Sequence, residues 1–310
     1  MLLAAILFMT GCQGSQNESE SQPAVPVNNT DVIKVVTSTS IVADWVENVG
    51  GDKVQINHVI PSETDPHTFS PTPKDIQIIQ EADVVFLVGE SYEDSWLTKL
   101  SSNVVDIDKK LQFLSDGVSL KEYILDEDDH SGHGEFDPHF WHDPTLVIGA
   151  VQKIAEDLGS VTNEEQAVFD LNRDAYINNL KELDGWIIST IATIPTTNRV
   201  LITSHESMRY FSDRYGFETS ISIMQSVSSS ESVTPKQLVE IIGLIEQHQT
   251  PAIFTDSYMS SKIEKSLSDE TGVEVIRLNM ESLTDAGDNS GSYISMMKNN
   301  ITKLANGLKD

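Results

Sequence analysis

The sequence of 310 residues has a single cysteine and few basic side chains. One cysteine excludes an internal disulfide and any zinc site built from several thiolates. The chain has 20 Lys and Arg residues and 48 Asp and Glu residues, which gives a formal net charge of −28. That charge would repel nucleic acid and concentrate cations near the surface, although a merely solubilising acidic coat is the alternative. Beyond the first dozen residues, no apolar run reaches the roughly 18 residues that a membrane-spanning helix needs.

The N-terminal segment combines a short apolar stretch with the only cysteine. The sequence MLLAAILFMTGCQGSQ runs from apolar residues through two small ones to Cys12, and a Ser-, Asn- and Pro-rich tract follows. This order resembles a bacterial lipoprotein signal, except that Met9 stands where leucine is usual and no Lys or Arg precedes the apolar core. The resemblance implies that 1–11 is a signal peptide, that Cys12 is acylated and that 12–31 is a flexible tether. An ordinary signal peptide or a buried N-terminal strand is the alternative.

Strand and helix patterns alternate along the rest of the chain. The first half opens with an apolar, β-branched strand (VIKVVTS), a helix that ends on glycines, and an alternating strand (KVQINHVI). The second half repeats this order, beginning with RVLITS and ETSISIMQ. We therefore predict an α/β protein with two similar βα lobes, an N-terminal lobe at 32–159 and a C-terminal lobe at 197–310.

One long helix is predicted between the two lobes. From Asn163 to Ile194, apolar residues recur at helical spacing without a break until Pro195. At 1.5 Å per residue, this helix would reach roughly 48 Å. We assign 160–196 to this linking helix, which would brace the lobes against each other; a surface helix of a single domain is the alternative.

Local signals also mark the later elements of the N-terminal lobe. Thr72 and Asp75 have the spacing of a capping box around Pro73, which predicts the start of a helix. The apolar segment NVVDI predicts a short strand at Asn103–Ile107. The polar stretch 108–142 is predicted to be a long loop, and such loops are normally functional or disordered.

Ligands of open α/β sheets bind beyond the carboxyl ends of the strands, so the loops after strands hold the candidate site residues. His67 follows KVQINHVI in a loop stiffened by three prolines, but taken alone it is better explained as an ordinary loop histidine. His139 and His142 precede a helix opened by Asp-Pro. An odd separation in an extended segment points two rings to opposite faces, so we expect one ligand from this pair.

Two further candidates lie in the second half. His205 follows the strand RVLITS, and Glu281 occupies the matching place after VEVIRLN. The segment HESMR begins like a metalloprotease helix, but Arg209 stands where that motif needs a second histidine. The metalloprotease interpretation therefore fails.

Four ordered segments together resemble one protein family. DPHTFSPTPKD, DPHFWHDP, TSHESMRYFSDRYGF and MESLTDAGDNSGSYISMMKNNITKLANGL look like segments of the zinc- and manganese-specific solute-binding proteins of ABC importers. In that family, two α/β lobes joined by one long rigid helix hold the metal in the cleft between them. The resemblance implies the ligands His67, His139, His205 and Glu281, with Glu281 standing where most members have aspartate.

An acidic, histidine-containing segment precedes His139. It resembles, in shorter form, the loop that many zinc members of the family carry, which implies that it gathers weakly bound ions at the mouth of the site. A disordered polar connector is the alternative. The residues of this acidic loop are Asp126, Glu127, Asp128, Asp129, His130 and His133.

The implied ligand set favours zinc. Three imidazoles and one carboxylate fill the four positions of a zinc site, and manganese members of the family more often replace the third histidine with a carboxylate. We predict an extracytoplasmic receptor, anchored to the cell membrane by a lipid on Cys12, that captures Zn²⁺ and delivers it to an ABC permease. We expect it to be a monomer without a nucleic-acid partner.

Three alternatives stay open at this point. One is a receptor of the same family for Mn²⁺ or Fe²⁺, and another is a surface adhesin with a structural metal. The third is a zinc-dependent hydrolase, because three histidines and one water also form a catalytic site. Glu281 as a fourth ligand would close the coordination position that a hydrolase needs, and the sequence has no GxSxG or HExxH pattern. We therefore expect the protein not to be an enzyme.

Overall fold

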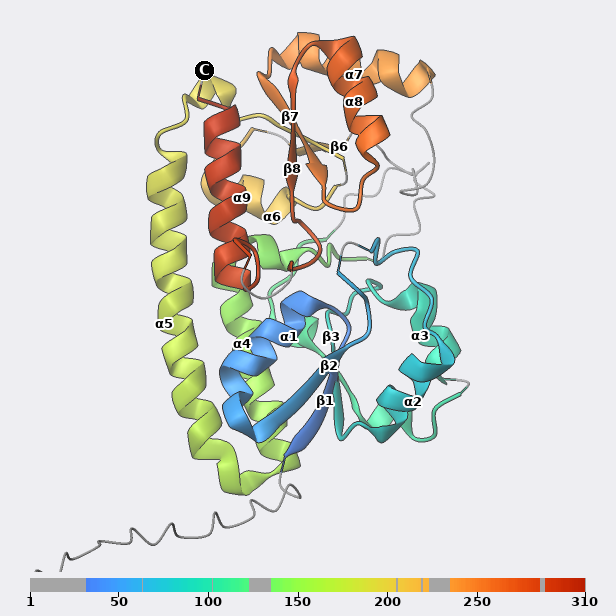
Figure 1. Ribbon diagram of the computed structural model, residues 1–310. Coiled ribbons are helices and arrows are strands. Elements are labelled where there is room, and N and C mark those ends of the chain that lie inside the picture. The colour runs from blue at the N-terminus through green and yellow to red at the C-terminus, as the bar shows by residue number, and fades with distance from the viewer. Residues whose placement is uncertain are drawn as a thin grey trace, which may run out of the picture. The chain divides into compact units, whose positions relative to one another are not determined.

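In the part of the chain that the structure describes, two parallel sheets of four strands each organise the fold (Figure 1). The structure is a computed structural model that describes residues 32–62, 64–101, 103–122, 135–204, 206–218, 220–222, 235–284 and 288–309. The predicted sites outside the described residues are Cys12 with its signal and tether, Asp126, Glu127, Asp128, Asp129, His130, His133 and His205. Val32–Asp310 form one compact unit.

The first sheet has the strand order β2-β1-β3-β4, and all neighbouring strands are parallel. Its strands are β1 (Ile33–Thr37), β2 (Val54–His58), β3 (Val84–Leu87) and β4 (Leu111–Phe113). The helices of this lobe are α1 (Ser40–Gly50), α2 (Pro73–Glu81), α3 (Asp94–Ser101) and α4 (Pro144–Val161). Strands β1 and β3 are apolar and almost wholly buried because α1 and α4 cover one face of the sheet and α2 and α3 cover the other.

The predicted capping box is present, but the strand predicted after α3 is wrong. Thr72 accepts a hydrogen bond from the backbone of Asp75, whose side chain accepts one from the backbone of Thr72. The chain turns within the predicted strand Asn103–Ile107, because Asp106 adopts a left-handed conformation with φ of 54°. The sheet instead continues with β4, which lies inside the predicted long loop and pairs with β3.

The second sheet repeats the strand order of the first, as β6-β5-β7-β8. Its strands are β5 (Leu201–Thr203), β6 (Ser220–Ser222), β7 (Ala252–Asp256) and β8 (Glu274–Leu278). The helices of this lobe are α6 (Arg209–Tyr215), α7 (Pro235–His248), α8 (Ser261–Thr271) and α9 (Tyr293–Gly307). The two lobes therefore have the same topology.

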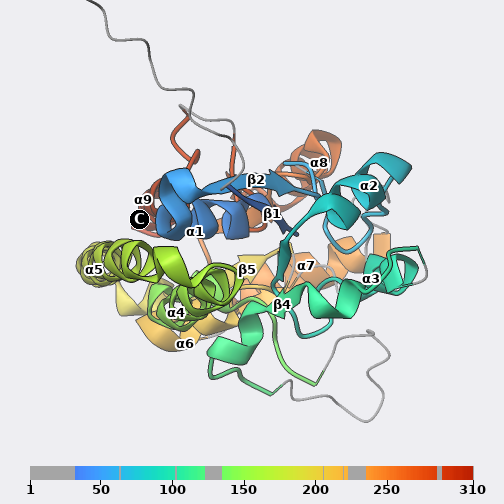
Figure 2. The ribbon, with the colours of Figure 1, turned by 90° about the horizontal axis from the view of Figure 1, so that it is seen from below.

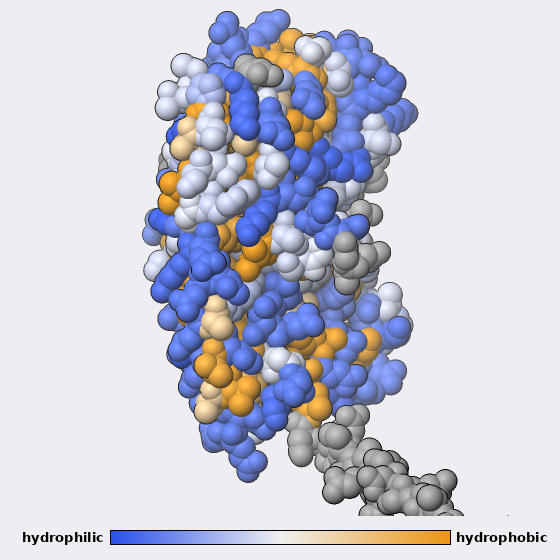
Figure 3. Space-filling view, turned by 60° about the vertical axis from the view of Figure 1, so that its left-hand side comes forward, coloured by the Kyte–Doolittle hydropathy of each residue, from blue (hydrophilic) through white to orange (hydrophobic). Residues whose placement is uncertain are grey.

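Helix α5 (Gln166–Ile191) runs alongside both lobes (Figures 1 and 2). It contacts α1 and α4 of the first lobe and α9 of the second. Its 26 residues span about 39 Å, less than predicted, because a 3₁₀ turn occupies Asn163–Glu165 and the helix ends before Pro195. The side of the molecule seen in Figure 3 is mostly hydrophilic, with separate apolar groups. Among the described helices, none is both long enough and apolar enough to cross a bilayer.

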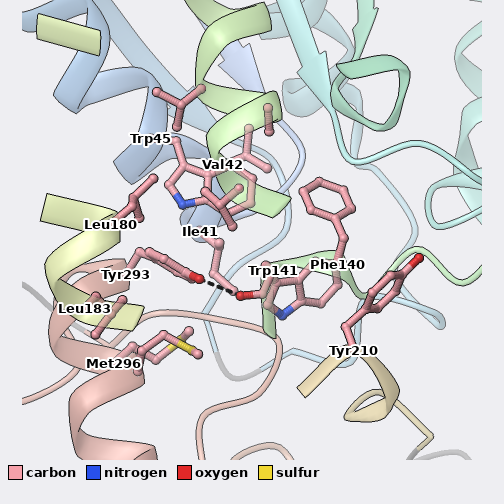
Figure 4. Packing of buried hydrophobic residues seen from close by; sticks show 14 of the residues in the cluster. Ile41, Val42, Trp45, Phe140, Trp141, Leu180, Leu183, Tyr210, Tyr293 and Met296 are labelled. Atoms are coloured by element: carbon pink, nitrogen blue, oxygen red, sulfur yellow. Dashed lines mark hydrogen bonds between the residues drawn. The ribbon is translucent and has the colours of Figure 1, made fainter. Parts of the chain in front are cut away.

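Buried aromatic side chains, shown in Figure 4, and one buried carboxyl group join the lobes near the start of α9. The ring of Tyr293 packs edge-on against Trp45 with 5.6 Å between centroids, and its hydroxyl donates to the carbonyl of Trp141 at 2.6 Å. Asp44 of α1 accepts a hydrogen bond from the hydroxyl of Tyr176 on α5 at 2.9 Å. It also accepts one from the backbone N–H of Tyr293, and burial raises the pKa of Asp44 from 3.8 to about 6. A single carboxyl group thus connects three helices.

Replacing Asp44 with asparagine is expected to change how stability depends on pH. The carboxyl group has a pKa of 3.8 in the unfolded chain and about 6 in the folded one, so the folded state loses stability as the pH rises through that interval. This gap corresponds to at most about 3 kcal/mol. The free energy of unfolding of Asp44→Asn minus that of the native protein should become more positive by about 1–3 kcal/mol as the pH rises from about 4 to 7. Urea titrations of metal-free protein measure this difference, and a constant difference would contradict the role of Asp44.

Candidate metal centre

His67 lies in the loop between β2 and α2. The side chain of Asp65 accepts a hydrogen bond from the backbone N–H of His67 at 2.9 Å, which closes a turn around Pro66. The hydroxyl of Thr68 donates to the carbonyl of Asp65 at 3.3 Å. The loop that carries His67 is therefore held by its own side chains.

His139 is presented by a second turn of the same kind. Asp137 Oδ1 accepts a hydrogen bond from the backbone N–H of His139 at 3.0 Å and lies 2.8 Å from ring atom Nδ1. Both side chains are fully buried. The carboxylate assigns the proton to Nδ1, so Nε2 is the ring atom that could bind a metal, and the hydrogen bond makes it more basic.

Glu281 reaches the same region from the second lobe. It follows β8 and is 3% exposed. Its Oε2 accepts a hydrogen bond from the hydroxyl of Tyr92 at 3.0 Å, and its Oε1 lies 3.7 Å from Nε2 of His139. Burial raises the pKa of Glu281 well above its usual range, and the nearby Asp256 raises it further. A cation placed beside Glu281 would offset this burial.

These three residues converge on one point. His67, His139 and Glu281 each offer one ligand atom, and the three atoms lie within 4.8 Å of one another. Bonds of about 2.0–2.2 Å to a shared zinc ion would place ligand atoms within roughly 4 Å of each other, so the group is close to the required size. Two imidazoles from the first lobe and one carboxylate from the second thus form a candidate metal centre.

Backbone hydrogen bonds fix the segment around Glu281 to the first lobe. The indole N–H of Trp141 donates to the carbonyl of Met280 at 2.8 Å. The backbone N–H of Leu283 donates to the hydroxyl of Ser40 at 2.9 Å. Glu281 is therefore held between two contacts that cross from one lobe to the other.

The predicted fourth ligand, His205, and the acidic loop lie outside the described residues. Ser204, which directly precedes position 205, is described and buried. Its backbone N–H donates to the carbonyl of Phe254 in β7 at 2.9 Å. Strand β7 pairs in turn with β8, which leads to Glu281. The chain before position 205 and the chain before Glu281 therefore end at the same edge of the second sheet.

His142 is buried but lies outside the group of three. Burial and the neighbouring His139 lower the pKa of His142 to about 3, so its ring is neutral. The assumption of extended backbone between the two histidines was wrong, because Phe140–His142 form a 3₁₀ turn. That His139 is the ligand of this pair stays a prediction.

Tyr92 and the two turn-forming aspartates were missed in the sequence. The sequence signal for Asp65 and Asp137 is the repeated tripeptide Asp-Pro-His, since an aspartate two residues before a histidine can accept its backbone N–H. Tyr92 has no such signal, because its partner Glu281 is 189 positions away.

A tight turn orients Tyr92. Gly89, Glu90 and Ser91 all have positive φ, of 96°, 50° and 64°. The carboxylate of Glu93 accepts hydrogen bonds from the backbone N–H groups of Val88 at 2.8 Å and Gly89 at 3.0 Å. These bonds hold the strained backbone in place and direct the buried Tyr92 ring towards the second lobe.

Comparison with known proteins identifies the family. A family model described as "Zinc-uptake complex component A periplasmic" matches residues 35–307. The chain belongs to this family. Among relatives of this zinc-uptake component A family, the manganese-binding lipoprotein MntA of Halalkalibacterium halodurans is 29% identical over 99% of this chain and 97% of its own length. The manganese ABC transporter substrate-binding lipoprotein PsaA of Streptococcus pneumoniae is 30% identical over 99% of this chain and 96% of its own length.

Solved structures agree with this membership in the zinc-uptake component A family. The periplasmic zinc-binding protein TroA of Treponema pallidum has a TM-score of 0.80 and 27% identity, covering 90% of this chain and 100% of TroA. A crystal structure of ZnuA has a TM-score of 0.76 and 25% identity, with the same coverage. The predicted fold class of two α/β lobes with a long linking helix is confirmed. The predicted class of metal-binding component of an ABC importer, not an enzyme, is also confirmed.

Proposed function

We propose that this protein captures Zn²⁺ outside the cytoplasmic membrane and delivers it to the permease of an ABC importer. The proposed ligands are His67, His139, His205 and Glu281. Three nitrogen donors and one oxygen donor form the four-coordinate set that zinc favours. The convergence of His67, His139 and Glu281 within 4.8 Å supports this proposal.

The hydrogen bond between Tyr92 and Glu281 supports zinc over manganese. Because Tyr92 engages Oε2, Glu281 offers the imidazoles one oxygen atom, Oε1. This atom is buried and accepts no hydrogen bond from any residue in the described part of the chain. One carboxylate oxygen with three imidazoles completes a tetrahedral zinc site, whereas Mn²⁺ prefers a larger number of oxygen ligands.

A manganese receptor is the second candidate. The relatives MntA of H. halodurans and PsaA of S. pneumoniae are both named for manganese. They align with nearly the whole of this chain, so relatives of similar length include proteins named for manganese. The choice between the two metals therefore depends on the ligand geometry around Glu281.

Competition titration of metal-free protein with a zinc chelator tests the proposal. We expect one zinc ion per chain with a Kd of about 10 nM or tighter, and weaker binding of Mn²⁺. A millimolar Kd for zinc would contradict the proposal. Because zinc outcompetes manganese at most sites in vitro, the metal content of protein purified without added metals provides a second measurement. Manganese in that preparation would favour the second candidate.

Replacing Tyr92 with phenylalanine is expected to weaken the preference for zinc. The change frees Oε2 of Glu281, so both carboxylate oxygens become available to a metal that accepts more oxygen ligands. We expect the ratio of the Kd for Mn²⁺ to the Kd for Zn²⁺ to fall by about tenfold. Tyr176→Phe is the matched control, because it also removes a buried tyrosine–carboxylate hydrogen bond but at Asp44. An unchanged ratio in Tyr92→Phe would show that Oε2 does not affect metal choice.

The proposal also covers the membrane anchor, the oligomeric state, the acidic loop and the lobe boundaries. We propose an acylated Cys12 as the membrane anchor, 12–31 as the tether, and a monomer that meets the permease directly. The acidic loop is proposed to gather ions near the site, and the lobe boundaries are proposed as 32–159 and 197–310. Fractionation of cells that express the full chain tests the anchor, and recovery in the soluble extracytoplasmic fraction would contradict it.

A further inference from the structure

Helix α6 of the second lobe is hydrogen-bonded to the segment that leads into His139. Tyr210, the second residue of α6, is 1% exposed. Its hydroxyl donates a hydrogen bond to the carbonyl of Asp137 at 2.8 Å and accepts one from the backbone N–H of Lys121 at 2.9 Å. Figure 4 shows Tyr210 beside Phe140, and α6 contacts the 3₁₀ turn that Phe140 begins. The hydroxyl of Tyr210 therefore uses both its donor and its acceptor capacity at this contact.

Lys121 and Asp137 belong to two paired segments. The backbone N–H of Asp137 donates to the carbonyl of Lys121 at 3.0 Å, and Glu122 forms an antiparallel bridge with Phe136. A single hydroxyl from the second lobe thus bonds one backbone group on each of the two paired segments.

Two other side chains of α6 contact the same pair of segments. Arg209 donates from Nη1 to the carbonyl of Glu122 at 2.8 Å, and Asp213 forms an ion pair with Lys121. Both of these contacts involve exposed groups, whereas the hydroxyl of Tyr210 is bonded in the buried part of the contact. Exposed ion pairs contribute little to stability or orientation, so Tyr210 is the main buried connection between α6 and these segments.

The bond to Asp137 leads directly to the candidate metal centre. The side chain of Asp137 holds His139 at its backbone N–H and at Nδ1. A shift of the Asp137 backbone would therefore move the imidazole that offers Nε2 to the metal. Helix α6 begins four residues after position 205, so the same short helix also follows the predicted ligand His205.

We propose that Tyr210 is a positioning residue for the metal site, acting from the second lobe through Asp137 on His139. The proposal rests on the proposed function, because it assumes that His139 binds the metal. Removing the hydroxyl takes this partner away from the carbonyl of Asp137, where the bond is buried, and from the N–H of Lys121, where it is partly buried. Buried polar groups that lose a partner shift towards another one, which displaces the turn that orients His139.

The test compares two tyrosines of the same helix. Tyr210→Phe removes the bonds to Asp137 and Lys121, and Tyr215→Phe removes a bond of the same length range, from the Tyr215 hydroxyl to Asp184 on α5 at 2.9 Å. Both tyrosines are buried, so both variants should lower the melting temperature of the metal-free protein by similar amounts. We expect the Kd for zinc to rise by about 10- to 100-fold in Tyr210→Phe and by less than about threefold in Tyr215→Phe. Equal Kd values in the two variants would overturn the proposal.

A double-mutant cycle identifies the route through Asp137. In an Asp137→Ala background, the Tyr210→Phe change should raise the Kd for zinc by less than about threefold, because the carboxylate that transmits the effect is gone. A further rise of tenfold or more in that background would show that Tyr210 acts by another route and would overturn the proposal.

A measurement without metal separates this inference from the proposed function. In the metal-free native protein, the proton on His139 Nδ1 should give a protected, low-field NMR signal because it is bonded to buried Asp137. We expect this signal to persist in Tyr215→Phe and to be lost or to exchange faster in Tyr210→Phe. An unchanged signal in Tyr210→Phe would overturn the positioning role even if zinc binds. Failure of the native protein to bind zinc, with the signal difference present, would instead contradict the proposed function alone.

Discussion

Zinc affinity is expected to fall by at least about 100-fold when His139 is replaced with alanine. Loss of an outer residue that only orients a metal ligand typically costs about 10- to 100-fold in affinity, so loss of the ligand itself should cost at least as much. The change removes the Nε2 donor that lies 3.7 Å from Glu281 Oε1, and it leaves the buried Asp137 carboxylate without the imidazole beside it. Competition titration with a chelator of known affinity measures the effect.

His142→Ala is the matched control for this variant. His142 is also buried and lies three residues away, but it is not part of the group of three ligand atoms. We expect its replacement to lower stability, since it opens a cavity, while zinc affinity stays within about threefold of the native value. His67→Ala and His205→Ala should behave like His139→Ala. Native-like zinc binding by His139→Ala would rule out the proposed site.

Glu281→Gln is expected to have opposite effects on zinc binding and on the stability of the metal-free protein. Glutamine retains the size of the side chain and an oxygen that can accept from Tyr92, but it cannot carry the negative charge that attracts Zn²⁺. We expect the Kd for zinc to rise by about 10- to 100-fold.

The gain in stability follows from the raised pKa of Glu281. Because burial raises the pKa of this group in the folded state, the metal-free protein loses stability as the pH rises from the unfolded value of 4.5 through the raised value. Glutamine does not ionise, so the variant avoids this loss of stability. Above neutral pH and in the presence of chelator, its melting temperature should therefore be higher than that of the native protein. Asp44→Asn is the control, because it removes another buried carboxyl group and should leave zinc affinity unchanged. A lower melting temperature for Glu281→Gln would contradict the unfavourable burial of this charge.

The sequence predicts the two lobes because the patterns that define them are local. Apolar, β-branched strands and capped helices alternate in both halves, and the strand order of the second sheet repeats that of the first. Strand β4 was missed because three residues, Leu111–Phe113, are too short to show a period, and only pairing with β3 makes them a strand. The left-handed conformation of Asp106 likewise depends on its surroundings.

The candidate site was partly predictable because local sequence patterns mark some of its residues. His67, His139 and Glu281 each follow a recognisable local segment, and a family resemblance linked them. Their mutual distance could not be derived from the sequence, because it depends on how the two lobes pack. The contacts of Tyr92 with Glu281 and of Tyr210 with Asp137 were hidden as well, since each joins opposite lobes. Contacts between positions 189 and 73 residues apart leave no periodic trace in a single sequence.

The contacts of Trp141 with Met280 and of Ser40 with Leu283 close the lobes over a centre whose His139 ring is inaccessible to water. An ion held by the proposed ligands would lie against two buried side chains, His139 and Glu281, which would slow its spontaneous escape. Under the proposed function, unloading would require these contacts to separate, and docking on the permease would supply free energy for that separation. The same few hydrogen bonds would therefore slow both the loss of the metal to solvent and its transfer to the permease.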